Sequence, residues 1–361
     1  MAYFDHAATG LPRCSYAKAA AVDAFDRPSP GRGHHAGQKA SQAILDAARA
    51  AVGALFPAHA HVVFTSGATA ALNQAILGLV PRPRRIALDP MLHNAVRRTV
   101  LSLGVPVWIL PCNPHGRVLP DRLARSWAPG TDLVVLTHAS NVTGIVQPVE
   151  EIVAFARRQR AKIVVDAAQT VGAIALGGLR DCDMLCFSGH KGLRSLPGTG
   201  ALVVKDGLVL DPRVWGGTGS EALPKTMPLE MPARLEPGTP NLPGIASLGA
   251  AARHHVPWPS LSVARRLQQI IQRAGFLPLV LGELPVVSFQ VPGVPCDKAG
   301  EFLDKKAGLQ VRTGLHCAPA AHEVLGTSPA GTVRISAGST TTDTEFDALV
   351  RGLALLRASV R

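Results

Sequence analysis

The sequence has 361 residues, of which 47% are hydrophobic and 17% are charged. This length allows one large domain and a smaller one, and the composition indicates a folded globular chain rather than a disordered one. Because no apolar run reaches the roughly 18 residues that a membrane span needs, and residues 1–6 do not resemble a secretory signal, we expect a cytoplasmic protein without membrane contact.

The formal net charge of +12 raises the question of nucleic-acid binding. The arginines are scattered and form no long basic run, and aromatic residues make up only 4% of the chain, too few for a base-stacking surface. We therefore expect small anionic molecules rather than nucleic acids as partners. The six cysteines lack the paired spacing of metal sites and disulfide scaffolds, so no metal site is predicted.

Short apolar runs alternate with alanine-rich helical stretches through the first two-thirds of the chain. The runs are continuous rather than alternating, as strands of a parallel sheet buried on both faces require. This pattern predicts an α/β fold with a mostly parallel seven-stranded sheet. The predicted strands are 61–64, 85–88, 105–110, 132–137, 162–166, 184–187 and 201–204, and the predicted helices are 68–79, 93–103, 149–160 and a segment near Val171.

A stretch rich in proline and glycine, residues 216–244, interrupts this alternation, and the pattern after it predicts a compact α+β domain. We predict a large domain of residues 1–250 and a small domain of residues 251–361, with the N-terminal arm contributing to the small one. The elements predicted for the small domain are helix 261–274, strand 286–291, helix 298–307, strands 309–312 and 332–336, and helix 344–356.

Polar residues follow several of these strands, at the edge where open α/β sheets bind ligands. The turn 65–69, Thr-Ser-Gly-Ala-Thr, leads from a strand into a helix, so its N–H groups and the helix dipole favour a phosphate group. The glycine allows close approach, and Thr69 adds a hydroxyl. Many strand-to-helix turns share this pattern, so it indicates a phosphate site only in combination with other residues.

Asp166 ends one predicted strand, and the run Ser-Gly-His-Lys at 188–191 ends the next. Asp166 is interpreted either as a helix cap or as the partner of a protonated pyridine nitrogen. A lysine at position 191, one strand after Asp-x-x-Gln, is a rare combination that favours a cofactor held as a Schiff base. Asn141 follows a third strand and His93 heads a helix, where each is placed to contact the same ring.

With these motifs, the chain resembles the class-V aminotransferase group of fold-type I pyridoxal-5′-phosphate enzymes. Within that group it is similar to SufS-like (group II) cysteine desulfurases and selenocysteine lyases. The resemblance extends almost from end to end and rests on the runs 3–9 (YFDHAAT), 31–35 (GRGHH), 64–69 (FTSGAT), 165–169 (VDAAQ), 188–191 (SGHK), 216–219 (GGTG) and 312–319 (RTGLHCAP).

The resemblance implies a site for pyridoxal 5′-phosphate and for an amino-acid substrate. Thr218 would reach the phosphate of the partner subunit, which implies a homodimer with shared active sites. Arg334 would clamp the substrate carboxylate, with Arg312 and Asn141 beside it. The implied cofactor-binding residues are Lys191 for the Schiff base, Asp166 for the ring nitrogen, Gln169 and Asn141 for the ring oxygen, His93 for the ring face, and Ala68, Thr69, Ser188 and His190 for the phosphate.

Cys317 distinguishes between reaction classes. Most free cysteines are small buried hydrophobic residues, but Cys317 lies in a segment flanked by glycine and proline, beside His316 and near Arg312, where positive charge favours a thiolate. The resemblance implies that it is the nucleophile, with Lys191 and His93 as the other catalytic residues. L-Cysteine would become L-alanine while its sulfur passes to Cys317 as a persulfide and then to an acceptor protein.

Two other classes of function stay open. The first is a different reaction on the same scaffold: selenocysteine lyase, another carbon–sulfur lyase or an aminotransferase-like activity. The second is a binding or scaffold protein that has lost catalysis. The chain departs from SufS-like enzymes in three places. The segment 251–285 is shorter, residues 192–197 read Gly-Leu-Arg-Ser-Leu-Pro instead of carrying Gly-Pro-Gln, and His93 is followed by Asn94 rather than by a second histidine.

Overall fold

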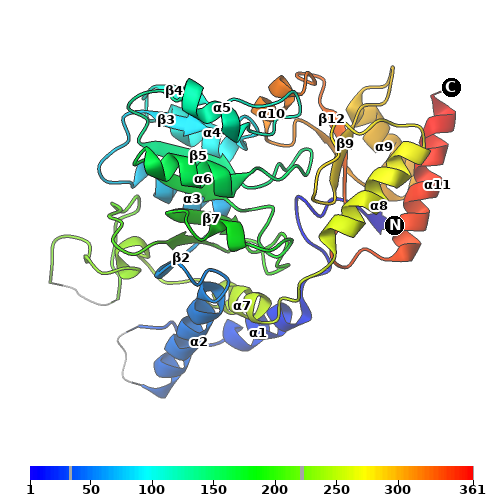
Figure 1. Ribbon diagram of the computed structural model, residues 1–361. Helices are drawn as coiled ribbons and strands as arrows, with labels where there is room; N and C mark the ends of the chain where they lie inside the picture. Colours follow the sequence, from blue (N-terminus) through cyan, green and yellow to red (C-terminus); the bar gives the residue numbers. More distant parts are fainter. Residues whose placement is uncertain (32–34, 220–222, 361) are drawn as a thin grey trace.

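The computed structural model describes residues 1–31, 35–219 and 223–360, so part of the run 31–35 lies outside the described residues. A seven-stranded sheet dominates the structure (Figure 1), and all seven predicted strands belong to it. They are β2 (His61–Thr65), β3 (Ile86–Leu88), β4 (Val107–Ile109), β5 (Leu133–Thr137), β6 (Lys162–Asp166), β7 (Met184–Ser188) and β8 (Gly200–Val204).

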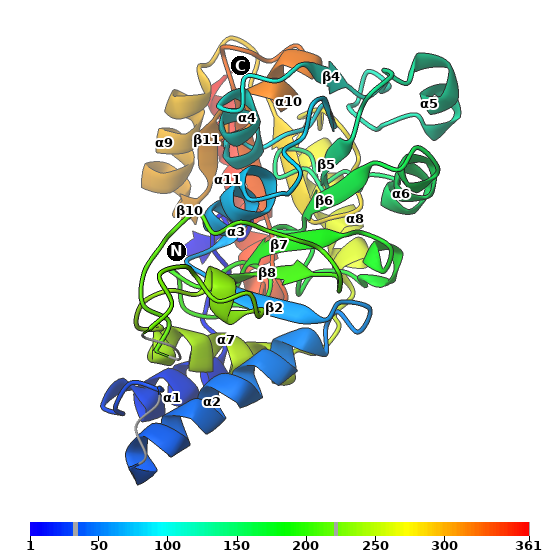
Figure 2. The ribbon, with the colours of Figure 1, turned by 90° about the vertical axis from the view of Figure 1, so that its left-hand side faces the viewer.

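The strand order is β2-β8-β7-β6-β5-β3-β4, and β8 is antiparallel to both of its neighbours while the other neighbouring pairs are parallel. Helices cover both faces, with α3 (Ala68–Leu77) and α4 (Asn94–Leu101) on one side and α5 (Pro120–Ser126) and α6 (Val149–Arg158) on the other, as Figure 2 shows. Along β5, Val134 and Leu136 pack into one core and Leu133 and Val135 into the other. Burial on both faces explains the continuous apolar runs.

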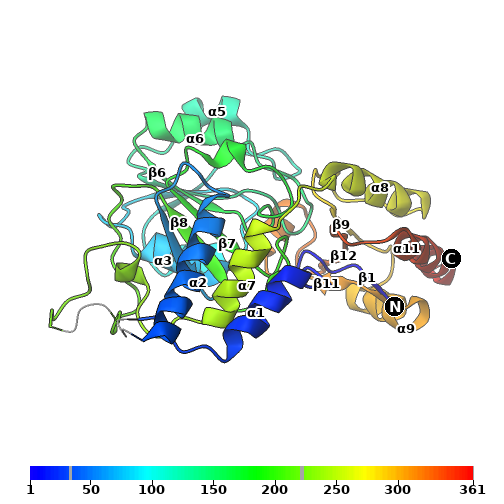
Figure 3. The same cartoon turned by 90° about the horizontal axis from the view of Figure 1, so that it is seen from below.

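Three helices that the pattern did not predict pack together (Figure 3). They are α1 (Ser15–Phe25), α2 (Ala36–Gly53) and α7 (Leu242–Arg253). Helix α7 begins inside the stretch 216–244, where the pattern predicts an interruption of the helices and strands. Pro243 is compatible with the first turn of a helix, and the Asn241 side chain caps that turn. The helix predicted near Val171 is wrong: residues 170–173 form turns, and Gly172 has a φ of 79°.

The C-terminal part has a three-stranded antiparallel sheet in the order β11 (Arg312–Gly314), β12 (Thr332–Ser336), β9 (Val286–Phe289). The predicted strand 309–312 is in fact two short strands, because β10 (Leu309–Gln310) pairs with β1 (Ala2–Tyr3) whereas β11 pairs with β12. Four helices of the described residues belong to this part, namely α8 (Ser260–Arg273), α9 (Cys296–Ala307), α10 (Pro319–Val324) and α11 (Asp343–Ser359).

The N-terminal arm packs into the core of this C-terminal part, where Phe4 is fully buried beside residues of β9, β12 and α11. The C-terminal part and the arm share a hydrophobic core of their own, which supports the division of the chain into a large domain of residues 1–250 and a small domain of residues 251–361. That division stays a prediction. Among the described residues, we find no helix long and apolar enough to cross a membrane.

Candidate active site

A cavity of about 200 Å³ lies at the carboxyl ends of β5, β6 and β7, facing the C-terminal part. Residues of the N-terminal arm, of the large sheet and of the C-terminal part line it together. Thr218 lies outside this set, in the long connection between β8 and α7. The predicted site residues that line the cavity are Ala68, Thr69, His93, Asn141, Asp166, Gln169, Ser188, His190, Lys191, Arg312, Cys317 and Arg334.

The N-terminus of α3 forms one end of the cavity. Gly67 precedes the helix with a φ of 143°, and the N–H of Ala68 donates to the Ser188 hydroxyl at 2.8 Å. A Cβ at Gly67 would lie 3.2 Å from that hydroxyl, so the tight turn depends on glycine. The positive end of the helix, the Thr69 side chain and Ser188 together make a site suited to an anion such as phosphate.

His190 stands beside this anion site, and its Nδ1 is hydrogen-bonded to the hydroxyl of Thr9 at 3.0 Å. Burial, together with the charges of Lys191 and Arg13, lowers the pKa of His190 to about 4. The ring is therefore neutral at pH 7 and carries one N–H donor and one acceptor nitrogen.

Asp166 is the last residue of β6, Lys191 follows the end of the neighbouring strand β7, and both line the cavity. One Asp166 oxygen accepts the N–H of Ala168 at 3.0 Å, so the residue caps a turn, not a helix. Burial lowers the pKa of Lys191, and the charges of Arg334 and Arg312 lower it further while Asp166 opposes them. The Lys191 amine consequently gives up its proton more readily than an exposed lysine, as a nucleophile or base requires.

His93 caps α4, because its Nδ1 accepts the N–H of Ala95 at 3.0 Å, and it lines the cavity as well. Burial lowers its pKa, so the ring is uncharged near neutral pH. Asn141 donates to the carbonyl of His316 at 2.7 Å, and its buried Oδ1 has no partner among the described residues. The Asn141 Oδ1 and the neutral His93 ring are therefore available for contacts with a ligand in the cavity.

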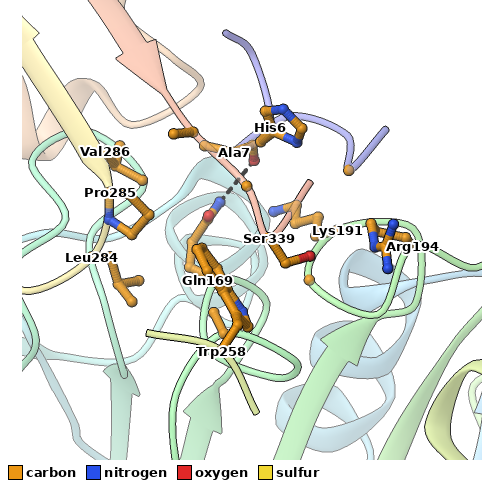
Figure 4. A pocket seen from close by; sticks show the side chains of 15 residues that line it. His6, Ala7, Gln169, Lys191, Arg194, Trp258, Leu284, Pro285, Val286 and Ser339 are labelled. Carbon is orange, nitrogen blue, oxygen red and sulfur yellow. Dashed lines mark hydrogen bonds between the residues drawn. The ribbon is translucent and has the colours of Figure 1, made fainter. Parts of the chain in front are cut away.

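A smaller cavity of about 40 Å³ adjoins the first and shares Ala7, Gln169 and Lys191 with it (Figure 4). The Gln169 amide donates to the carbonyl of Ala7 at 3.0 Å, the dashed line in Figure 4. Trp258 and Leu284 also line this smaller cavity. Gln169 is therefore anchored to the N-terminal arm while it lines the larger cavity.

Cys317 is exposed, so the interpretation of this residue as a buried hydrophobic side chain is wrong. A guanidinium nitrogen of Arg312 lies 3.6 Å from its Sγ. His316 and Cys317 have φ values of 50° and 58°, which side-chain-bearing residues adopt only when surrounding contacts hold them there. One such contact is the bond from the Asn94 N–H to the Cys317 carbonyl at 2.7 Å.

Arg334 is almost completely buried, with 1% of its surface exposed. One terminal nitrogen donates to Asp5 at 2.6 Å and the other to the carbonyl of Asn141 at 2.9 Å. Asp5 belongs to the run 3–9, one of the motifs of the family resemblance, which implies no role for it. No spacing rule could have paired it with Arg334, because 329 positions separate the two residues.

The chain belongs to the class-V aminotransferase family, whose model matches residues 2–349. It is similar to a cysteine desulfurase from Salmonella agona (strain SL483), with 34% identity over 267 residues. That match covers 69% of this chain and 64% of the relative, less than two thirds of its length.

Solved structures extend the likeness over nearly the whole chain. The apo cysteine desulfurase from Thermococcus onnurineus NA1 has a TM-score of 0.89 at 26% identity, with 99% of this chain and 95% of that one covered. The cysteine desulfurase CsdA from Escherichia coli has a TM-score of 0.84 at 26% identity, with 98% and 94% covered. The predicted fold-type I architecture is thereby confirmed.

Members of this family depend on pyridoxal 5′-phosphate, which is the cofactor of this chain. The donor set of the cavity fits this molecule. The N-terminus of α3 suits its phosphate, the carboxylate of Asp166 suits a protonated ring nitrogen, and Lys191 has a lowered pKa and lies near both. Asn141 retains an unpaired acceptor in the same cavity.

Proposed function

We propose that this protein is a cysteine desulfurase of the SufS-like group, which converts L-cysteine to L-alanine and carries the sulfur as a persulfide on Cys317. The observation that carries the proposal is the exposed thiol of Cys317, which lines the same cavity as Lys191 and lies 3.6 Å from Arg312. The similarity to cysteine desulfurases supports the choice of L-cysteine as substrate.

The cofactor roles that we propose follow the geometry of the cavity. The α3 N-terminus with Thr69, Ser188 and His190 holds the phosphate, and Asp166 keeps the ring nitrogen protonated. Lys191 binds the cofactor, with Gln169 and Asn141 near the ring oxygen and His93 against the ring face. When bound, pyridoxal phosphate supplies an electron sink that stabilises negative charge at the substrate Cα.

Two cationic side chains orient the substrate in this proposal. Arg334 binds the substrate carboxylate through the N–H groups that Asp5 and Asn141 leave free. Arg312 lines the same cavity, and one of its guanidinium nitrogens donates to the Cys317 Sγ at 3.6 Å. Lys191 Nζ, with its lowered pKa, takes the proton from Cα and returns it.

The sulfur transfer balances without any further oxidant. The Cys317 sulfur forms a bond with the substrate sulfur as the substrate Cβ–S bond breaks. The electron pair of that bond stays with Cβ, which gains a proton, so that cysteine leaves as alanine and Cys317 carries the extra sulfur. The substrate carbon is reduced and the sulfur is oxidised to the level of a persulfide.

We also propose a homodimer in which Thr218 contacts the cofactor phosphate of the partner subunit. Thr218 lies in the connection between β8 and α7 and not at the cavity of its own chain, which supports a role in a second copy. A cytoplasmic location fits a thiol that must stay reduced to receive sulfur, since reducing conditions prevail there. An acceptor protein would then take the sulfur from the exposed Cys317.

The test is an assay of the purified protein, loaded with pyridoxal phosphate, with L-cysteine as substrate and a thiol reductant that releases the persulfide sulfur as sulfide, and with sulfide and alanine measured in parallel. We expect equal amounts of both products, and Lys191→Ala removes both the activity and the yellow absorbance of the bound cofactor. Turnover of L-selenocysteine alone would identify a selenocysteine lyase instead. A colourless protein that binds no cofactor would identify the non-catalytic alternative.

A further inference from the structure

The ion pair between the buried Arg334 and the half-buried Asp5 links the predicted substrate site to the N-terminal arm. Arg334 has 1% of its surface exposed, and a buried guanidinium without a paired charge is costly. Asp5 provides that charge at 2.6 Å from one terminal nitrogen, while the carbonyl of Asn141 accepts from the other at 2.9 Å. Two acceptors on two nitrogens fix the plane of the guanidinium.

Asp5 itself is held in place by the arm and by β12. Its backbone forms a bridge with Ser336, and the hydroxyl of Ser336 accepts the N–H of Ala7 at 2.9 Å. The Tyr3 hydroxyl donates to the carbonyl of Asp5 at 3.1 Å or to that of Thr9 at 2.9 Å. The Asp5 carboxylate thus occupies a defined position, with one oxygen 2.6 Å from a terminal nitrogen of the guanidinium.

We infer that Asp5 is a positioning residue, which orients Arg334 so that its remaining N–H groups bind the carboxylate of the amino-acid substrate. This inference rests on the proposed role of Arg334. The Nε of Arg334 is buried and has no acceptor among the described residues, although Arg334 lines the cavity. A carboxylate entering the cavity supplies the acceptor that this N–H lacks.

Asp5 has two opposing effects on the affinity of Arg334 for the substrate carboxylate. Its negative charge weakens the attraction of Arg334 for the substrate, whereas its hydrogen bond keeps the guanidinium in the one orientation that meets the substrate. Removing one partner of a buried pair leaves the other uncompensated, so the side chain turns toward other acceptors or water. Orientation outweighs competition here, and loss of Asp5 weakens binding of the carboxylate.

The experiment compares Asp5 variants of the holoenzyme for ligands with and without a carboxylate. Asp5→Ala is expected to raise KM for L-cysteine and the Kd for L-alanine about tenfold, a change of about 1.4 kcal/mol, with kcat little changed. The inhibition constant of cysteamine, which lacks the carboxylate, stays the same. Asp5→Asn retains an oxygen acceptor of the same length and restores binding to within about threefold of the parent protein.

Asp347→Ala, the same substitution at an exposed position of α11, is the matched control, because Asp347 does not line the cavity. Its KM for L-cysteine is expected to equal that of the parent protein. Should Asp5→Ala fail to fold, Asp5→Ser gives the same measurement, since a serine hydroxyl is too short to reach Arg334. The thermal midpoint of each variant shows whether it is folded.

Three results overturn the inference: an unchanged KM in Asp5→Ala or Asp5→Ser, a lower KM, or an equal loss of affinity for cysteamine and L-alanine. Arg334→Lys tests the underlying proposal separately. If that variant binds L-cysteine and L-alanine as the parent protein does, Arg334 does not bind the carboxylate and the proposed role fails. If it loses affinity but the Asp5 variants do not, only the role of Asp5 fails.

Discussion

The backbone of Gly10 crosses the backbone of Lys191 with no room for a side chain between them. The N–H of Gly10 donates to the carbonyl of His190 at 2.9 Å, and Arg13 donates to the same carbonyl at 3.1 Å. A Cβ built on Gly10 would overlap the carbonyl oxygen of Lys191 and the side chain of Arg194. The N-terminal arm therefore packs directly on the loop that carries the proposed cofactor lysine.

Gly10→Ala is predicted to destabilise the protein by about 1–3 kcal/mol, since the added methyl group forces the arm away from the Lys191 loop. Denaturant unfolding measures this loss, and titration with pyridoxal phosphate is expected to show weaker cofactor binding. Gly177→Ala is the control, because nothing lies within 4 Å of its added Cβ, and it changes stability by no more than about 0.5 kcal/mol. Equal effects of the two substitutions would contradict the packing argument.

Cys317→Ala is predicted to lower sulfur release from L-cysteine at least about 10²-fold, because the nucleophile that receives the sulfur is gone. Cofactor absorbance stays unchanged, since Lys191 and the phosphate site are intact. Cys296→Ala is the control: Cys296 donates to the carbonyl of Ala330 at 3.2 Å, begins α9, and is not part of the cavity lining. Full desulfurase turnover by Cys317→Ala is the outcome that rules out the persulfide mechanism.

Asp166→Ala is predicted to reduce kcat for L-cysteine by about 10²-fold or more, because the ring nitrogen loses the charge that keeps it protonated. The absorbance spectrum should still show bound cofactor, which separates loss of chemistry from loss of binding. Asp181→Asn, a substitution of an exposed aspartate between η1 (Gly177–Leu179) and β7, serves as the control. A kcat like that of the parent protein would remove Asp166 from the proposed site.

Protonation of His138 is predicted to weaken the fold in acid. His138 is 6% exposed and hydrogen-bonded to Thr170 at 2.9 Å, and burial lowers its pKa to about 4. An unfolded histidine titrates at about 6.5, so between these values the unfolded chain binds more protons and the free energy of unfolding rises with pH. The full contribution is on the order of 3 kcal/mol and is lost as the pH falls from 6.5 to 4.

His138→Gln is expected to reduce the slope of unfolding free energy against pH in this window, measured by urea unfolding at pH 4, 5 and 6.5. Part of the slope remains in this variant, because the pKa values of His6 and His190 are also lowered to about 4 and these two residues titrate in the same window. The control is His115→Gln at an exposed position, which leaves the slope as it is. A slope in His138→Gln identical to that of the parent protein contradicts the prediction.

Local patterns of the sequence determined the seven strands of the main sheet and the polar residues at their ends. A strand such as β6 needs only its own run of apolar residues to be recognised, because both of its faces are buried. Once parallel strands are placed in one sheet, Asp166 and Lys191 must approach each other at its carboxyl edge. The cofactor class followed from this arrangement together with the family resemblance.

Helices α1 and α2 show where local patterns were insufficient. Both are rich in alanine, and their packing against α7 decides their place, with Gly249 of α7 lying against Ala48 of α2. In α1, alanine marks neither a clear apolar face nor a polar one, so the periodicity that reveals other helices is weak there. Their position depends on contacts between segments nearly 200 residues apart, as in the bond from Arg253 to Ala47, 206 positions away.

The sequence by itself determined the class of cofactor and the lysine, aspartate and cysteine of the proposed reaction, because each belongs to a short local motif. Only the tertiary structure decided how those groups are supported: Asp5 beside Arg334, Gly10 against Lys191, and Asn94 bonded to the Cys317 loop. These contacts form when the arm, the sheet and the C-terminal part meet. No local sequence pattern predicts these contacts, because they join residues that are far apart along the chain and close only in the folded protein.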